Sequence, residues 1–184
     1  RQAIAMSWDF TEVNPFSDSN GNWMGNSIQW VEKSLLALPR WAEPGSATQA
    51  DASTQSISQS KVVSTDPPYY DNIGYADLSD FFYVWLKRCI GGLFPEVFVT
   101  PLTPKKEEAT SLKHRHDGSA EKARKHYRNI LEKSFTESLR VVRVPKLVTV
   151  MFAHQSTDAW IALISALFSA GLSPNATWPL ATEM

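Results

Sequence analysis

The stretch from Lys61 to Tyr70 constrains the fold more than any other, because two adjacent prolines follow directly on a β-branched run. Val62 and Val63 favour a buried strand, and the prolines fix φ and hold the residues before them extended. A helix cannot begin until both prolines are passed. The sequence therefore predicts a strand over 61–65 that ends in a stiff turn, and such strand ends are where open α/β sheets bind ligands.

The residues of this turn, which we call the tip, are Asp66, Pro67, Pro68 and Tyr69. The Asp66 carboxylate and the Pro67 carbonyl are hydrogen-bond acceptors, and the Tyr69 ring offers a flat stacking surface. A strand that ends in a proline-rich turn is also common in unrelated proteins, so four residues alone do not separate a ligand site from a simple turn.

Asp-Pro-Pro-Tyr in this context resembles the catalytic motif of amino-methyltransferases, which methylate the exocyclic amine of adenine with S-adenosyl-L-methionine. The longer run from Asp66 to Arg88 looks like that of adenine-specific DNA methylases that carry a domain of unknown function at their N-terminus. The resemblance implies a Rossmann-like doubly wound α/β sheet of the S-adenosylmethionine-dependent methyltransferase fold. It also implies that the tip residues are catalytic.

The resemblance further implies that the substrate is adenine N6 in DNA, with the base flipped out so that Tyr69 stacks on it. RNA adenine and cytosine N4 use similar chemistry and remain alternatives. Asp66 would lie beside the cofactor as well. Asp51 lies where the family places an acidic residue near the cofactor's adenine, and it is otherwise a plain surface aspartate.

An apolar helix is predicted over 76–90, because large apolar residues recur there at helical spacing. Cys89 lies on its apolar side and is expected to be buried. Tyr70, Asn72 and Tyr75 lie in or beside the turn that precedes this helix. We expect these three side chains to face the cleft and contact substrate.

Positive charge is concentrated in residues 105–146, which hold 12 of the 18 Lys and Arg against 6 Asp and Glu. Such a block is typical of a surface that faces a polyanion, although it also fits a solvated helix with ion pairs. His114, His116 and His126 lie within it, but no metal site is predicted because no regular element fixes a third ligand. The candidate DNA-backbone contacts are Lys105, Lys106, Arg115, Lys122, Arg124 and Lys125.

The remaining apolar patterns alternate between helix and strand, which is typical of a doubly wound sheet. We therefore assign 61–184 to a catalytic core with a basic insertion at 104–146, and 1–60 to a variable segment of loops and one helix. The other predicted elements are helices over 26–38, 119–143 and 157–170 and strands over 147–153 and 176–181.

No Gly-x-Gly occurs among the eight glycines, so the glycine-rich turn that holds the cofactor in such enzymes is absent. With the resemblance, this indicates a fragment that lacks the first strands of the sheet. The strand at 61–65 would then expose an edge, and we expect self-association through it. A non-catalytic nucleic-acid-binding or structural fragment is the alternative from another class.

The cysteine count and the lengths of the apolar runs bear on where the protein resides, and a second short motif offers another candidate tip. A single cysteine excludes an intrachain disulfide and fits a reducing cytoplasm, and no apolar run approaches the ~20 residues of a membrane span. Asn14-Pro15-Phe16 is a weaker candidate tip, because it lacks a second proline and no β-branched strand precedes it.

Overall fold

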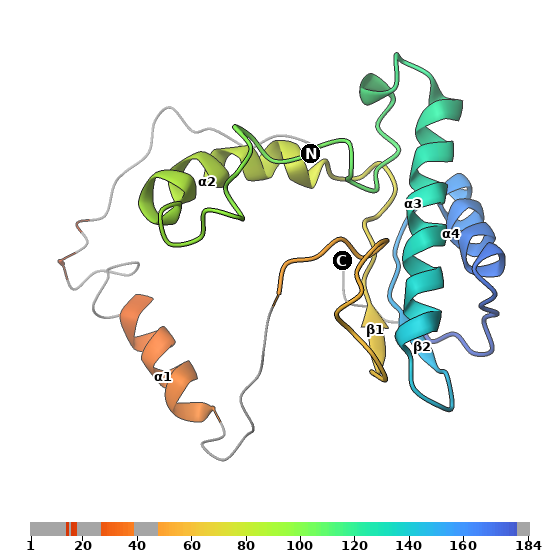
Figure 1. Ribbon diagram of the computed structural model, residues 1–184, viewed down its shortest axis with the longest axis horizontal. Helices are drawn as coiled ribbons and strands as arrows, with labels where there is room; N and C mark the ends of the chain where they lie inside the picture. The colour runs from red at the N-terminus through yellow and green to blue at the C-terminus, as the bar shows by residue number, and fades with distance from the viewer. Residues whose placement is uncertain (1–13, 15, 18–26, 39–47, 180–184) are drawn as a thin grey trace. The chain divides into compact units, whose positions relative to one another are not determined.

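The computed structural model describes residues 14, 16–17, 27–38 and 48–179. The chain divides into two compact units, one made of Ala5–Gln49 and the other of Arg1–Ile4 with Ala50–Met184. The larger unit contains both strands and all but one of the described helices (Figure 1).

Two short parallel strands form the sheet of the larger unit, with β1 at Val63–Thr65 and β2 at Val148–Val150. Val63 pairs with Val148 and Thr65 with Val150. The Met151 N–H donates to the Thr65 carbonyl at 2.9 Å, which extends the pairing by one residue. Beyond that point the prolines of the tip end β1, as predicted for the 61–65 stretch.

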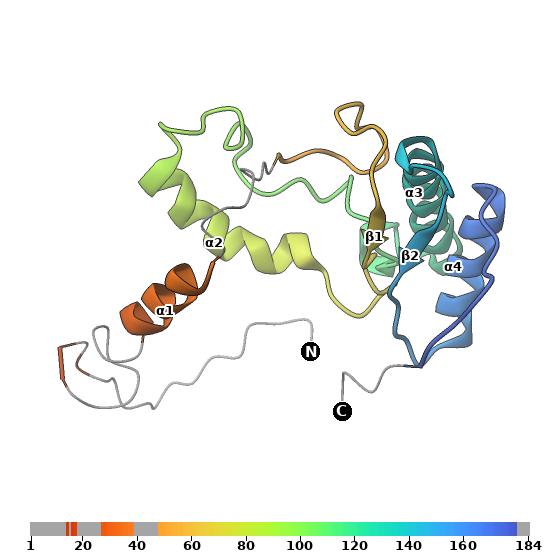
Figure 2. The ribbon, with the colours of Figure 1, turned by 90° about the horizontal axis from the view of Figure 1, so that it is seen from below.

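Two helices cover one face of this sheet, α3 at Ala120–Val141 and α4 at Thr157–Ser169 (Figures 1 and 2). Ser119 caps α3 by accepting from the Lys122 N–H at 3.2 Å. Their small and large apolar side chains form the core, and Val150 and Phe152 pack against it from the sheet. The buried members from the two helices include Tyr127, Leu131, Phe135, Ala159, Leu163 and Ala166.

Helix α2, at Tyr75–Ile90, confirms the predicted helix over 76–90. A loop folds back on it, because the Tyr83 hydroxyl donates to the Thr100 carbonyl at 2.7 Å and Asp80 accepts from the Thr103 N–H at 2.9 Å. The predicted burial of Cys89 is wrong, since the thiol is exposed. No described residue covers the face of α2 on which Cys89 lies, and Phe81, Phe82 and Trp85 of the same helix are exposed too.

The strand predictions need three corrections. Val62 is 68% exposed, because alternate residues of a strand face opposite sides and its side has no covering helix among the described elements. Strand β2 is shorter than the predicted 147–153, since β1 ends after Thr65 and offers no further partner. Residues 176–179 of the predicted 176–181 strand are irregular, and 180–181 lie outside the described residues.

The smaller unit contributes helix α1, at Gln29–Ala37, within the predicted 26–38 helix. Its apolar side chains, among them Trp30 and Leu35, are exposed. Residue 26 and the aromatic residues near the start of the chain, such as Trp8, lie outside the described residues. Asn14 of the weaker candidate tip caps its own turn, accepting from the Phe16 N–H at 3.0 Å.

The described residues thus contain four α-helices and a two-stranded parallel sheet, a mixed arrangement that fits the α/β class. Helices α3 and α4 match the predicted 119–143 and 157–170 helices to within two residues at each end. Among the described helices, none is long and apolar enough to cross a membrane.

The two phenylalanines Phe135 and Phe81 provide a matched test of where the core lies. Phe135 is 2% exposed and Phe81 is 57% exposed. Phe135→Ala is expected to lower the free energy of unfolding by about 3–5 kcal/mol, because it opens a cavity in the core. Phe81→Ala should change it by less than about 1 kcal/mol. Denaturant melts measure both free energies. Equal losses would show that Phe81 is buried in the folded protein and would contradict this assignment of the core.

Candidate functional site

The tip projects from the carboxyl end of β1 and is held by the core. The buried Tyr127 of α3 donates its hydroxyl hydrogen to the Pro68 carbonyl at 2.7 Å. Two short backbone bonds tighten the turn, from the Tyr70 N–H to the Pro68 carbonyl and from the Asn72 N–H to the Tyr69 carbonyl, each at 3.0 Å. The tip is therefore a fixed feature of the fold.

Tyr127 can only serve this role as a hydrogen-bond donor. Burial raises the pKa of its phenol well above the usual range, since a phenolate loses its hydration in the core. The hydroxyl therefore keeps its proton at any ordinary pH, and the bond to Pro68 is maintained.

The Tyr69 ring is oriented by aromatic neighbours from β2 and α4. It meets Phe152 edge to face, with ring centroids 5.4 Å apart, and Phe152 meets Trp160 in the same way at 5.0 Å. Such edge-to-face pairs restrict ring rotation and add about 0.5–1.5 kcal/mol each. Tyr69 is partly exposed and thus presents a fixed ring at the surface of the tip.

Tyr70 does not face a cleft, which corrects the expectation that it contacts substrate. It is 7% exposed and belongs to the core, where its ring meets Tyr127 at 5.2 Å and His154 at 5.7 Å. Its φ of 55° turns the chain sharply after the second proline and directs the side chain inward. Asn72 and Tyr75, the other two residues of that prediction, are exposed.

His154, at the carboxyl side of β2, is a site residue that the sequence reasoning did not select. Its Nδ1 accepts from the Ser156 N–H at 2.9 Å, so the ring proton lies on Nε2, which donates to Asp71 at 3.2 Å. This bond joins the ends of the two strands. The available signal was its position, since the histidine directly follows the predicted 147–153 strand.

Asp66 is exposed at the end of β1. Within the part of the chain that the structure describes, neither its carboxylate nor the Pro67 carbonyl has a hydrogen-bond partner. These are two acceptors on adjacent residues of one turn, of which Asp66 is exposed and Pro67 is buried. The arrangement suits a ligand group that carries two N–H donors on one nitrogen.

The candidate DNA contacts differ in how they are paired. Arg115 is half enclosed by an ion pair to Asp77 at 2.6 Å and a second ion pair to Glu108, and its side chain is 13% exposed. Burial opposes the charge, yet the bonds to the two carboxylates outweigh it and raise the pKa of Arg115. Arg115 therefore joins α2 to the loop at 105–118.

Lys105 has a similar structural partner. It forms an ion pair with Asp80 of α2 at 2.6 Å. Burial alone would raise the pKa of Asp80, but hydrogen bonds from Lys105 and Thr103 outweigh burial and lower it. Lys105 thus anchors the same loop.

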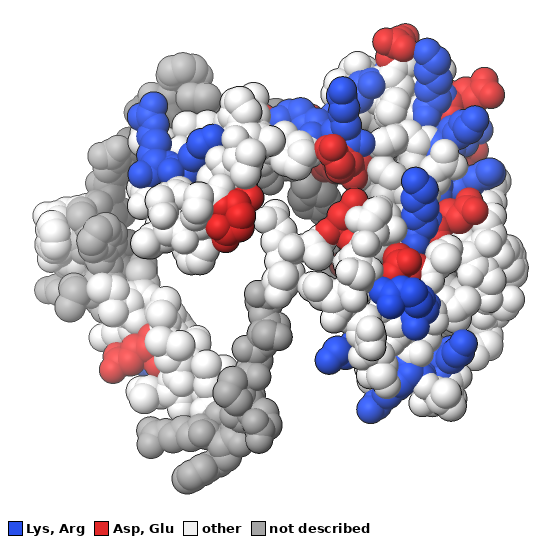
Figure 3. All heavy atoms as spheres, in the orientation of Figure 1, with Lys and Arg blue, Asp and Glu red and all other residues white. Residues whose placement is uncertain are grey.

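The cations on α3 are exposed and mixed with carboxylates (Figure 3). Lys122 pairs with Asp117 at 2.9 Å and Arg124 with Asp158 at 3.0 Å. Lys106 and Lys125 are exposed and have no ion-pair partner among the described residues. Among the described residues the surface of α3 is therefore only partly ion-paired.

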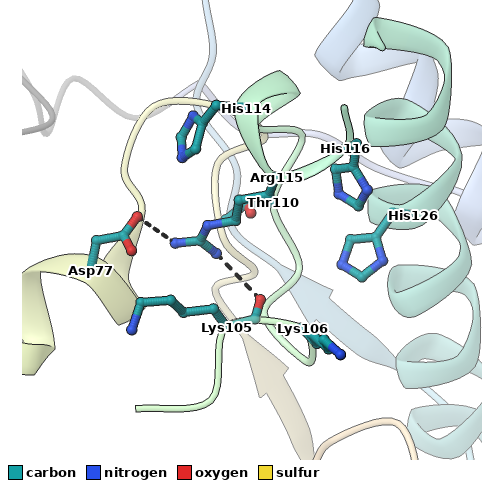
Figure 4. A pocket seen from close by; sticks show the side chains of 8 residues that line it. All are labelled: Asp77, Lys105, Lys106, Thr110, His114, Arg115, His116 and His126. Atoms are coloured by element: carbon teal, nitrogen blue, oxygen red, sulfur yellow. Dashed lines mark hydrogen bonds and ion pairs between the residues drawn. The ribbon is translucent and has the colours of Figure 1, made fainter. Parts of the chain in front are cut away.

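The larger unit has a hollow of about 620 Å³, which we call the basic hollow. It is lined by the eight side chains labelled in Figure 4, from α2, α3 and the loop between them. The tip itself does not line it. Among the described residues, no three His, Cys, Asp or Glu side chains gather as metal ligands, although three histidines lie here: His114, His116 and His126.

Two of these histidines face each other. The rings of His116 and His126 have centroids 4.8 Å apart, and His126 Nε2 donates to the Glu108 carbonyl at 3.0 Å. Burial lowers the pKa of His116, and the adjacent His126 lowers it further. His116 is therefore neutral near pH 7.

Asp51 occupies a turn before β1. It accepts from the Ser53 hydroxyl at 2.7 Å and the Ser53 N–H at 2.8 Å, and these two bonds lower the pKa of its carboxyl. Asp51 thus stabilises its own turn, and among the described residues its carboxylate is bonded to Ser53 and not to Asp66.

The described glycines do not form a cofactor-binding turn at the carboxyl end of the sheet, where the tip lies. Gly74 precedes α2, and an added Cβ there would meet Asp77, Leu112 and Arg115 within 3.3 Å. Gly118 and Gly171 take positive φ values, but they end a loop and a helix rather than follow a strand. These residues therefore do not supply the close backbone approach that a dinucleotide-like cofactor needs.

A scan against protein-family models finds no matching family, and searches of curated proteins and of solved structures find no similar chain.

Arg115 and Lys122 provide a matched comparison of a shielded and an exposed ion pair. Arg115→Met is expected to lower the free energy of unfolding by about 2–4 kcal/mol, because it leaves the Glu108 carboxylate shielded and unpaired. Lys122→Met should cost less than about 0.5 kcal/mol, as exposed pairs do. Urea melts decide this, and equal small losses would contradict a structural role for Arg115.

The contact between His116 and His126 predicts a shifted titration. The NMR midpoint of His116 should lie below its ordinary 6.5. His126→Gln keeps a donor for Glu108 and removes the imidazole, so the midpoint should rise while remaining below 6.5 because burial persists. A wild-type midpoint at or above 6.5 would contradict the packing of this ring pair.

Proposed function

We propose that this chain carries the substrate-binding tip of an S-adenosylmethionine-dependent methyltransferase that acts on adenine N6 in DNA. The observation that supports it most strongly is the exposed, unpartnered Asp66 carboxylate beside the Pro67 carbonyl on a braced turn at the carboxyl end of a parallel strand. The sequence motif at the tip points to the same chemistry.

The exocyclic amine of adenine is a weak nucleophile, because its nitrogen lone pair is delocalised into the ring. Asp66 accepts one N–H of the amine and the Pro67 carbonyl accepts the other. These bonds favour a tetrahedral nitrogen whose lone pair is no longer conjugated with the ring. The cofactor, when bound, would supply the methyl group as its S–CH3 bond breaks, leaving S-adenosylhomocysteine, and the methylated nitrogen releases one proton to Asp66 or to water. The contribution of the tip is orientation, which can account for much of a rate enhancement.

The brace from Tyr127 is central to this proposal. Because Tyr127 and the Tyr70 N–H both use the Pro68 carbonyl, that carbonyl does not compete with Pro67 for the amine. The Tyr69 ring, held by Phe152, stacks on the flipped base. The turn is thus prepared before the base arrives, which reduces the entropy lost on binding.

Other parts of the proposed enzyme lie beyond the described residues. Since the glycines described here form no cradle at the tip, the proposal assigns the cofactor's main contacts to other residues, with the sheet completed as a Rossmann-like methyltransferase. Lys106 and Lys125, which are exposed, are the best placed of the candidate cations to contact the DNA backbone, because their charge is not neutralised by a described partner.

Methyl transfer from labelled S-adenosylmethionine to adenine-containing DNA tests the proposal. The assay compares this chain with a form extended upstream in the same reading frame, each with Asp66 and with Asp66→Ala. We expect transfer in the extended form and a loss of at least about 100-fold in Asp66→Ala, because the amine is no longer oriented. Asp66→Asn retains one acceptor oxygen and should lose less.

Glu96→Ala serves as a control, because it removes an exposed carboxylate that lies neither in the tip nor in the wall of the basic hollow. It should leave most of the transfer intact. No incorporation by the extended form into DNA or RNA would contradict the proposal and favour a nucleic-acid-binding module. Equal activity of Asp66→Ala would exclude the tip as the site.

A further inference from the structure

The basic hollow is lined by an excess of groups that bind oxyanions. Its wall has Lys105, Lys106 and Arg115, three histidines and one threonine against a single carboxylate, Asp77 (Figure 4). Ammonium, guanidinium, imidazole and hydroxyl groups are the side chains that contact phosphate oxygens in proteins.

The ion pairs determine which of these charges remain available. Arg115 has two carboxylate partners and Lys105 has one, Asp80, so the charges of these two cations are more than neutralised. Lys106 is exposed and has no ion-pair partner within the described part of the chain. Lys106 is therefore the one of the three cations on this wall whose ammonium group makes no direct ion pair with a described residue.

Thr110 provides an independent sign that the hollow takes a ligand. The residue is only 1% exposed and lines the hollow, and its hydroxyl has no hydrogen-bond partner among the described residues. Among the described residues no fully buried side-chain polar atom lacks a partner, so this hydroxyl is within the small part of Thr110 that remains accessible. A ligand oxygen in the hollow can accept its hydrogen in place of water.

Residues close to Thr110 in the chain are bonded to the turn that follows the tip and to the first turn of α2. The Ser111 N–H donates to the Tyr70 carbonyl at 2.8 Å, and Glu108 accepts from the Ala76 N–H at 3.1 Å. A group bound by Thr110 is therefore held in a fixed relation to the tip.

We propose that the basic hollow binds a phosphate group, with the Thr110 hydroxyl and the Lys106 ammonium as its donors and His114 and His116 beside them. Two sources share this chemistry, a phosphodiester of the nucleic-acid backbone and a free phosphate or mononucleotide. The placement of a substrate phosphate beside the tip rests on the proposed function, whereas phosphate binding itself does not.

Amide NMR of the 184-residue chain, titrated with inorganic phosphate at constant ionic strength, tests the proposal. We expect saturable shifts that concentrate at residues 105–116. Thr110→Val preserves the shape of the side chain and should weaken phosphate binding by about tenfold or more, as expected for a lost hydrogen bond to a charged group. Lys106→Ala should also weaken it.

Lys133→Ala is the matched control, because it removes one exposed positive charge from α3 that does not line the hollow. It should leave the affinity unchanged. Absence of saturable shifts at 105–116, or equal affinities for Thr110→Val, Lys106→Ala and Lys133→Ala, would overturn the proposal. Because no methyl transfer is measured, a failure here is distinct from a failure of the proposed function.

A second titration, with a single-stranded oligonucleotide, identifies the source of the phosphate. Tighter binding than inorganic phosphate, weakened by Thr110→Val, would support a backbone phosphodiester. Binding of phosphate and of adenosine monophosphate, with no dependence of oligonucleotide affinity on Thr110, would support a free phosphate or mononucleotide.

Discussion

The hydrogen bond from the Tyr127 hydroxyl to the Pro68 carbonyl is the contact on which the site depends. It joins residues 59 positions apart in the chain and links the buried centre of α3 to the turn after β1. Because α3 packs on α4 and on the sheet, this one bond transmits the rigidity of the core to the tip. Asp66 is an exposed carboxylate on the turn that this bond braces.

Local patterns predicted most of the elements. The β-branched run before two prolines located β1 and its end, and helical spacing located α2, α3 and α4. Burial was harder to predict, as Cys89 and Val62 show, because an apolar pattern identifies a face of a helix or strand but not whether another element covers it. A local pattern also does not show which helices and strands pack against one another.

The candidate site could be predicted only in part, because contacts between residues that are distant in the chain leave no local pattern. The tip follows from four adjacent residues, whereas the partners of Arg115 lie 7 and 38 positions away and no local pattern connects them. Tyr70 turned inward because its positive φ reverses the chain, which the residue type does not announce. Thr110 carried no motif at all, and only its burial against the basic hollow distinguishes it.

The central claim is that Asp66 and the Pro67 carbonyl accept the two N–H groups of an adenine amine. NMR titration of the 184-residue chain with adenosine and with N6,N6-dimethyladenosine tests it directly, because the second nucleoside has the same ring and no N–H to donate. The account predicts that adenosine shifts the signals of Asp66 to Tyr69 and that the dimethylated nucleoside does so far more weakly. Equal shifts from both nucleosides, or shifts confined to other residues, would contradict it.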